Sequence, residues 1–148
     1  MTNAFDYVIA KGLDTEESYP YKAATEKCHF NPKTIGVQAK GYVNITAGSE
    51  AELQKAIAEI GPISVALDAS HSSFQLYKSG VYDEPTCSST QLDFAGLMVG
   101  YGTQGTADYY IFKNIWGTSW GNQGYMLMSR NKKNQCGVAT LASYPIVI

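Results

Sequence analysis

The chain has 148 residues, a formal net charge of −2 at pH 7, and 45% hydrophobic against 16% charged residues. This length suits one domain with its own core, and the composition is typical of a globular protein and not of a disordered one. The weak negative charge gives no electrostatic footprint for nucleic acid, and no run of about 18 apolar residues would span a membrane. We therefore expect no nucleic acid and no membrane among its partners.

The first third of the chain predicts a helix, a loop and a strand. Apolar residues within 3–11 recur on one helical face, and Gly12 follows as a helix-ending residue. Residues 13–36 are rich in proline and glycine, which predicts an ordered loop. Residues 37–45 predict a strand.

The middle of the chain predicts a second helix and a buried strand. Ser49 and Glu52 form a capping box, and the apolar residues that follow, up to Ile60, recur at helical spacing. Gly61-Pro62 ends this helix, and residues 63–68 predict a buried strand.

The rest of the chain predicts a short helical turn after His71 and a series of strands. The candidate strands, separated by glycine-rich turns, are residues 80–83, 95–102, 108–114 and 124–129. Helices with about six strands indicate the α+β class. From these patterns alone, an α+β sheet domain of unknown type is the simplest interpretation.

Two motifs in the second half are more specific. Residues 92–102 are LDFAGLMVGYG and residues 113–121 are KNIWGTSWG. They resemble the histidine and asparagine strands of papain-family cysteine proteases of the cathepsin L type. Further segments that resemble the family, in the expected order, are ESYPY at 17–21, GPISVA at 61–66, CGVA at 136–139 and ASYP at 142–145.

The resemblance implies a papain-like fold. We expect mostly the antiparallel, barrel-like sheet domain at residues 31–148, with a remnant of the helical first domain at residues 1–30. Family members carry their nucleophile near the mature N-terminus, so the resemblance places this chain in the C-terminal two-thirds of such a protein, after the nucleophile segment.

Phe94 stands where the resemblance implies the catalytic histidine. A phenyl ring neither accepts nor donates a proton, so the general base has no carrier at this position. Asn114 matches the asparagine that orients the histidine, and Trp116 matches a tryptophan that shields the pair. We predict that Asn114 is a vestigial orienter with only a structural hydrogen bond. Ile115 replaces the usual serine, so that Phe94 and Ile115 together suggest a site filled with apolar groups.

The two remaining histidines, His29 and His71, are the only alternatives for a base that swings toward Asn114. We expect His29 to face solvent in the turn-rich segment. His71 matches a family histidine that is not catalytic. A relocated base is therefore the less favoured hypothesis.

The chain has three cysteines. The resemblance implies that Cys87 and Cys136 form the disulfide of the sheet domain, and that Cys28 is unpaired because its partner lies upstream. Three reduced thiols are the alternative. Cys28 has Lys27 and His29 beside it, which would favour a reactive thiol, but an unpaired disulfide cysteine explains it better. No metal site and no cofactor are expected, since Cys28-His29 is too short a spacing for a zinc motif.

The resemblance also maps peptide binding onto this chain. The positions are Met1, Ala66, Leu92, Asp93, Ala95 and Leu141. The five apolar ones suit a pocket for an aromatic or aliphatic side chain. Ala95 and Leu141 are larger than the usual family residues, and Phe94 adds bulk, so we expect a shallow pocket. Ordinary core packing is the alternative.

The sequence thus predicts a cathepsin L-like homologue that has lost catalysis and acts in binding or structure. One alternative is a fragment of a cysteine protease that hydrolyses peptide bonds. Another is a silicatein-like biomineral protein, a cathepsin L relative with a serine nucleophile, although silicateins keep the histidine.

Partners and location follow from the same resemblance. Without its first domain, the chain would expose an apolar face, which predicts self-association or a chain that supplies that domain, with a peptide or protein as a further partner. Asn44-Ile45-Thr46 is a glycosylation sequon. It fits a secreted, lysosomal or extracellular protein.

Overall fold

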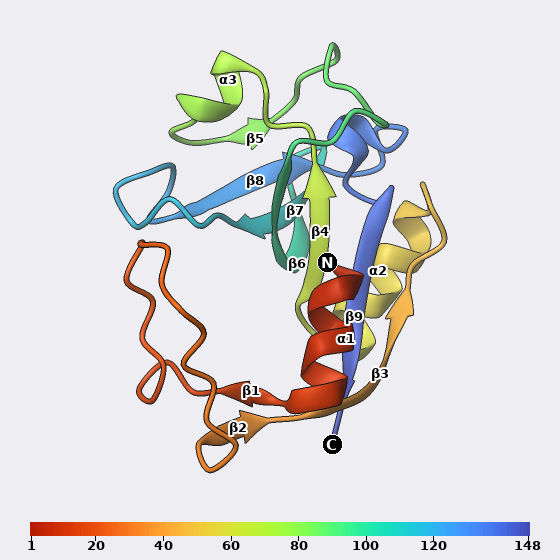
Figure 1. The fold of residues 1–148 in the computed structure, drawn as a ribbon. Helices are drawn as coiled ribbons and strands as arrows, with labels where there is room; N and C mark the ends of the chain where they lie inside the picture. The colour runs from red at the N-terminus through yellow and green to blue at the C-terminus, as the bar shows by residue number, and fades with distance from the viewer. The chain divides into compact units, whose positions relative to one another are not determined.

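The computed structural model describes residues 1–148 (Figure 1), which separate into two units. The smaller unit comprises residues 1–43 and 145–148, and the larger comprises residues 44–144. No helix is long and apolar enough to cross a membrane. The predicted division into 1–30 and 31–148 concerns the domains of the family and stays a prediction.

The smaller unit begins with helix α1 (Thr2–Lys11), as the sequence predicts. Gly12 ends the helix, and its N–H donates to the carbonyl of Val8 at 2.8 Å. Gly12 has a φ of +83°, and a Cβ there would meet Ile35, so only glycine fits. The following turn-rich segment is anchored by a short antiparallel pair that the sequence did not predict, β1 (Leu13–Asp14) with β2 (Ile35–Val37).

Helix α2 (Glu50–Glu59) shows how its sequence signature works in the larger unit. The Ser49 hydroxyl accepts a hydrogen bond from the N–H of Glu52 at 3.2 Å, as the capping box predicts. The Glu52 carboxylate departs from the box, because it accepts from the N–H of Thr46 instead. The buried face is Leu53, Ala56 and Ile57. Ile60, expected on that face, is 56% exposed because the helix ends there.

The main sheet has seven strands in the order β3-β9-β4-β6-β7-β8-β5. Their bounds are β3 (Ala39–Asn44), β4 (Ile63–Leu67), β5 (Val81–Tyr82), β6 (Phe94–Gln104), β7 (Ala107–Lys113), β8 (Tyr125–Ser129) and β9 (Leu141–Val147). The ladders from β9 through β4, β6 and β7 to β8 are antiparallel, and β5 pairs with β8 in parallel. Strand β9 was not predicted. Its burial does not alternate, and it contains Pro145.

The core of the larger unit lies between this sheet and α2. In β4, alternate residues are buried, as expected for a strand with one face on the core. The fully buried large side chains are Leu53, Ile63, Val65, Leu67, Phe74, Met98, Tyr110, Phe112, Met126, Met128 and Val138. Two short helices complete the unit, α3 (Ser72–Gln75) after His71 and a 3-10 turn at Gln135–Gly137.

Candidate functional site

Phe94 opens strand β6, where its backbone pairs with Leu67 of β4. Its ring is partly buried and packs against the hydrophobic core. The ring centroid lies 5.0 Å from that of Trp116 and 6.0 Å from that of Phe74. Phe94 therefore occupies its position by packing, with no polar contact of its side chain.

Phe94 belongs to a group of five rings that we call the aromatic cluster: Phe74, Phe94, Phe112, Trp116 and Trp120. Phe74 is fully buried and lies at its centre, with centroid distances of 5.5 to 6.2 Å to the other four. Tilted and edge-to-face pairs of this kind contribute roughly 0.5–1.5 kcal/mol each beyond their area burial. The cluster fills the space around Phe94 with hydrocarbon and indole surface and holds no proton-transfer group.

Asn114 lies directly after strand β7 and is only 6% exposed. Its N–H donates to the carbonyl of Gly124 at 3.0 Å, and its Oδ1 accepts from the N–H of Ile115 at 2.6 Å. The other side-chain atom, Nδ2, is buried without any hydrogen-bond partner. An unpaired buried amide costs about 1–3 kcal/mol. Half of this side chain is therefore committed to the local backbone, and the other half lacks a partner.

No histidine is bonded to Asn114. The Nε2 atom of His71 lies 3.5 Å from Oδ2 of Asp68, and His29 belongs to the smaller unit, where its Nε2 lies 3.9 Å from Glu26. Ile115 does not fill the site as expected, because its side chain points to solvent and is 73% exposed. Of the two apolar replacements near the site, Phe94 alone is packed.

A shallow cavity of about 440 Å³ lies beside the aromatic cluster, lined by Ala69, Ser70, Gln75, Asp93, Phe94 and Trp116. One wall is fixed by the indole N–H of Trp120, which donates to the carbonyl of Gln75 at 2.9 Å. Asp93, one of the predicted binding residues, accepts from the N–H of Ala69 at 2.8 Å. Its carboxylate thus secures the turn after β4.

The other predicted binding positions are partly brought together. Ala66 of β4 pairs with Ala95 of β6 on one side and with Leu141 of β9 on the other, so the three form one row across the sheet. Leu141 is 57% exposed. Leu92 is half-buried near the 3-10 turn, and Met1 is exposed in the smaller unit.

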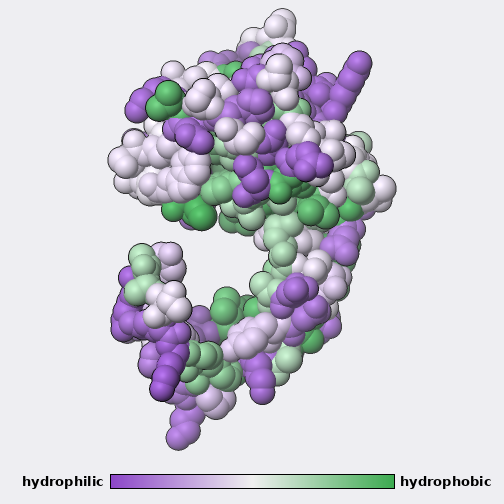
Figure 2. Space-filling model, turned by 45° about the horizontal axis from the view of Figure 1, so that its top comes forward, coloured by the Kyte–Doolittle hydropathy of each residue, from purple (hydrophilic) through white to green (hydrophobic).

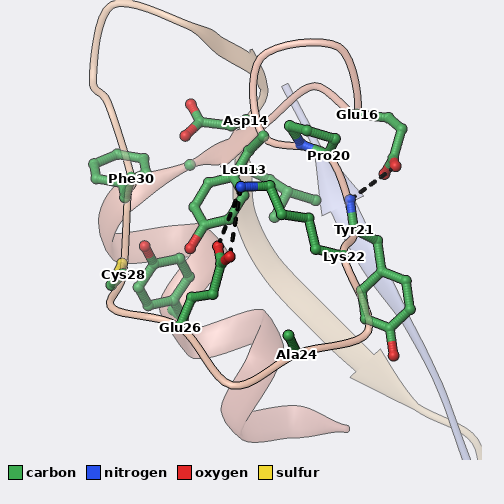
Figure 3. Close-up of a pocket in the computed structure, with 13 residues that line it drawn as sticks. Leu13, Asp14, Glu16, Pro20, Tyr21, Lys22, Ala24, Glu26, Cys28 and Phe30 are labelled. Carbon is green, nitrogen blue, oxygen red and sulfur yellow. Dashed lines mark hydrogen bonds and ion pairs between the residues drawn. The ribbon is translucent and has the colours of Figure 1, made fainter.

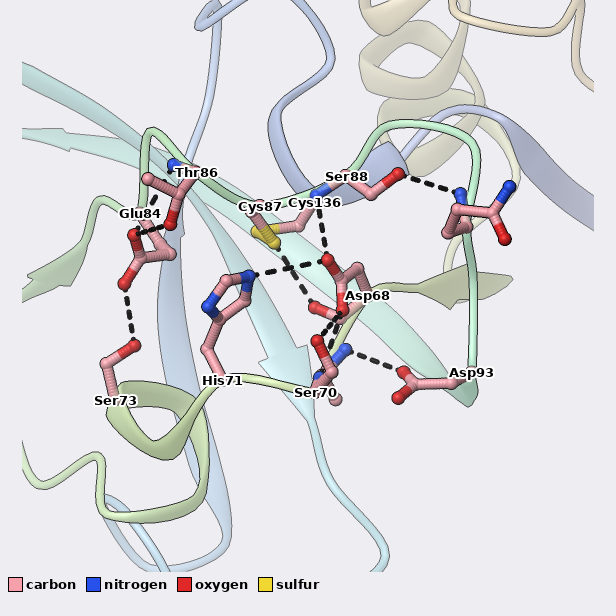
Figure 4. A network of polar contacts seen from close by, with 12 residues as sticks. Asp68, Ser70, His71, Ser73, Glu84, Thr86, Cys87, Ser88, Asp93 and Cys136 are labelled. Atoms are coloured by element: carbon pink, nitrogen blue, oxygen red, sulfur yellow. Dashed lines mark hydrogen bonds and ion pairs between the residues drawn. A yellow bond between two sulfur atoms is a disulfide. The ribbon is translucent and has the colours of Figure 1, made fainter.

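The predicted Cys87–Cys136 disulfide is present. Next to it lies a polar network that the sequence analysis missed (Figure 4). The buried carboxylate of Asp68 accepts from the N–H and hydroxyl of Ser70, at 3.0 and 2.7 Å, and from the N–H of Ser88 at 2.7 Å. Burial raises the pKa of Asp68, but these hydrogen bonds outweigh it, so that the pKa lies below its usual value. The contributing segments are far apart in sequence, so no local pattern marks this network.

Cys28 is free and exposed in the smaller unit. It lines a pocket of about 540 Å³ together with Tyr7, Phe30 and the loop after β1 (Figure 3). Partial burial and then the Cys28 thiol raise the pKa of Tyr7. In the larger unit, Asn44 and Thr46 of the sequon are both exposed. Glycosylation there stays a prediction.

Known proteins resemble this chain over its whole length. A family model described as papain family cysteine protease matches residues 1–146. A cathepsin L-like peptidase of Aedes aegypti is 56% identical over 149 residues, which cover 99% of this chain and 44% of the relative. Cathepsin L of Sarcophaga peregrina is 54% identical with the same coverage.

Solved structures similar to this chain also come from cathepsin L-like proteins. The digestive procathepsin L2 proteinase from Tenebrio molitor larval midgut is 41% identical with a TM-score of 0.94, over 99% of this chain and 46% of that one. The digestive procathepsin L 3 of the same source is 38% identical with a TM-score of 0.91, over 97% of this chain and 47% of that one. This chain thus spans about half the length of the relatives that it matches.

Proposed function

This chain belongs to the papain family of cysteine proteases, among its cathepsin L-like members, and we propose that it is a non-catalytic member that acts by binding. Its α+β fold is that of the family's solved structures. The observation that carries the proposal is the packing of Phe94 into the aromatic cluster, at the position where the resemblance implies the family's histidine.

The chemistry of the family explains why this replacement matters. A cysteine protease needs an imidazole that takes the thiol proton and later returns it to the leaving amine. Phe94 cannot perform either step. The unpaired Nδ2 of Asn114 supports the same conclusion, because the amide retains its place while no imidazole contacts it. Loss of one essential triad member costs on the order of 10⁶ in rate in a serine-protease triad.

The second part of the proposal is a binding role for the larger unit. Figure 2 shows hydrophobic side chains gathered along one border of this unit. Its exposed large apolar residues are Ile60, Leu76, Tyr101, Ile115, Trp116, Tyr125 and Leu141. Contiguous apolar surface usually has a partner. We propose a protein partner, either a chain segment equivalent to the family's first domain or a second copy of this chain.

The Cys87–Cys136 disulfide favours an oxidising destination, since such bonds persist in secreted and extracellular proteins. We therefore propose a secreted or lysosomal location. The exposed sequon at Asn44 is compatible with that route.

The test is a fluorogenic peptide assay on the full-length natural protein that contains this sequence. We expect no turnover that depends on a thiol, in the wild type or in a matched Phe94→Leu control. Phe94→His is the informative variant, because it puts an imidazole where the resemblance implies the family's base, and thiol-dependent turnover in this variant alone would support the proposal. Wild-type turnover that a thiol alkylator abolishes would overturn the proposal.

A further inference from the structure

The polar network around Asp68 contains an arrangement that the proposed function does not use. Side-chain atoms of Asp68, His71 and Cys87 that can bind a metal all lie within 4.8 Å of one another. Cys136 is adjacent to them because it is bonded to Cys87. We call these four residues the disulfide corner. A carboxylate, an imidazole and two cysteine thiolates are ligand types that bind Zn²⁺, so the two sulfurs become ligands only after the disulfide is reduced.

We propose that the disulfide corner becomes a zinc-binding site when a dithiol reductant opens the Cys87–Cys136 bond. The reductant's two thiols give two electrons and two protons to the disulfide, which yields two protein thiols and a cyclic disulfide of the reductant. Zn²⁺ then displaces both thiol protons and is held by two thiolates, the His71 imidazole and the Asp68 carboxylate. This set gives the closed, four-coordinate geometry of structural zinc sites.

The distances suit such a site. In tetrahedral coordination with zinc–ligand distances of about 2.0–2.3 Å, neighbouring ligand atoms lie roughly 3.3–3.8 Å apart. The Nε2 of His71 is already 3.5 Å from Oδ2 of Asp68. The Cα atoms of Cys87 and Cys136 are 4.8 Å apart, so side-chain rotation can bring the separated sulfurs to the required spacing.

The surrounding contacts hold these ligands in place without the disulfide. The N–H of Asp68 donates to the carbonyl of Cys136 at 2.9 Å, which ties the two segments together through their backbones. Ser70 donates its N–H and hydroxyl to Oδ1 of Asp68, while Oδ2 accepts from the N–H of Ser88 at 2.7 Å and lies 3.5 Å from Nε2 of His71. Figure 4 shows Glu84 on the side of His71 away from Asp68, where a carboxylate can orient the imidazole.

This site would replace one cross-link by another. The disulfide ties residues 49 positions apart, and the metal would tie the same two cysteines and also the turn that carries Asp68 and His71. The larger unit would then keep its fold in reducing surroundings as long as zinc is present.

The experiment uses the full chain with Cys28→Ser, which removes the only free thiol. The protein is reduced with dithiothreitol, freed of reductant by anaerobic gel filtration, and titrated with Co²⁺ and then Zn²⁺. We expect one equivalent of Co²⁺ with thiolate-to-metal and tetrahedral d–d absorption in the reduced protein, displaced by Zn²⁺. The oxidised protein should show neither band.

Two variants separate this site from adventitious binding. His71→Ala should weaken Zn²⁺ binding by more than about tenfold, the scale on which even outer-shell changes act. His29→Ala, which alters the other histidine, should leave it unchanged. An unfolded chain could also bind metal through its two cysteines, but without any contribution from His71. Near-ultraviolet circular dichroism therefore checks that the reduced, metal-bound protein is folded. Equal binding by oxidised protein, no effect of His71→Ala, or a reduced chain that Zn²⁺ does not keep folded would each overturn the proposal.

Discussion

The aromatic cluster and the disulfide corner lie at opposite ends of one short helix. His71 precedes α3 and faces Asp68, while Phe74 within α3 lies at the centre of the aromatic rings. In the disulfide corner, the buried carboxylate has a donor for each oxygen. Near the aromatic cluster, by contrast, the Nδ2 atom of Asn114 is buried without a hydrogen-bond partner.

The contrast shows that buried polar groups without hydrogen-bond partners are confined to a few positions of the larger unit. Burying a polar group without a partner is unfavourable, and the disulfide corner avoids this cost at every position. Asn114 is one of only two residues with a buried side-chain atom that lacks a partner, the other being Ser143. One of the two unpaired buried atoms therefore lies in the residue that matches the family's orienting asparagine, while the buried carboxylate of the disulfide corner is fully paired.

The largest loss of stability should come from removing the ring at the centre of the aromatic cluster. Phe74→Ala leaves a cavity among four rings, and we expect a loss of about 3–5 kcal/mol in the free energy of unfolding. Urea denaturation measures it. Leu76→Ala, two residues further along and 74% exposed, is the matched control and should cost less than about 0.5 kcal/mol. Equal costs for both would mean that the cluster does not support the fold.

Asp68→Ala tests the disulfide corner in the same way. It removes three hydrogen bonds and leaves the N–H of Ser88 without its acceptor, so we expect a loss of about 2–4 kcal/mol. Asp93→Ala is the control, because that carboxylate accepts a hydrogen bond from the N–H of Ala69, and its loss should cost about 1 kcal/mol. If the two variants were equally stable, the Asp68 network would contribute no more to stability than the single hydrogen bond of Asp93.

The stability that Asp68 contributes should depend on pH, with a smaller effect than its replacement by alanine. Its pKa is lowered in the folded protein, because hydrogen bonds to Ser70 and Ser88 outweigh the opposing effect of burial. Its contribution is therefore complete above the unfolded pKa of about 4 and is lost as the pH falls through the folded pKa. The stability difference between wild type and Asp68→Asn should shrink below about pH 4. A difference that stays constant from pH 7 to pH 3 would contradict this.

The sequence predicted the elements whose patterns are local. Capping residues and helical spacing predicted α1 and α2, and the apolar residues after Gly61-Pro62 predicted β4. Strand β9 was missed because tertiary pairing, and not its own pattern, makes it a strand. The short β1–β2 pair was missed for the same reason.

In the candidate site, too, residues in local motifs were predicted and residues brought together only by the fold were not. Phe94 and Asn114 were found because each lies in a motif that resembles the family. The disulfide corner was not found, because Asp68, Ser88 and Cys136 come from three distant segments and none carries a local signal. A resemblance can mark a position along the chain, but only the structure shows which side chains pack around it.

The smallest effect is expected at Asn114 itself. Asn114→Leu gives up the bond to the N–H of Ile115, worth about 0.5–1.5 kcal/mol, but also removes an amide nitrogen whose burial costs about 1–3 kcal/mol. We expect a change within about 1 kcal/mol of zero in the free energy of unfolding.

The same substitution should behave differently once an imidazole is present. In a Phe94→His background we expect the amide to gain the imidazole as a partner, so Asn114→Leu should then cost about 1–2 kcal/mol more than it does alone. A double-mutant cycle by urea denaturation measures this coupling. Coupling near zero would mean that Asn114 no longer reaches the position of the lost base, and that the site has changed beyond a single residue.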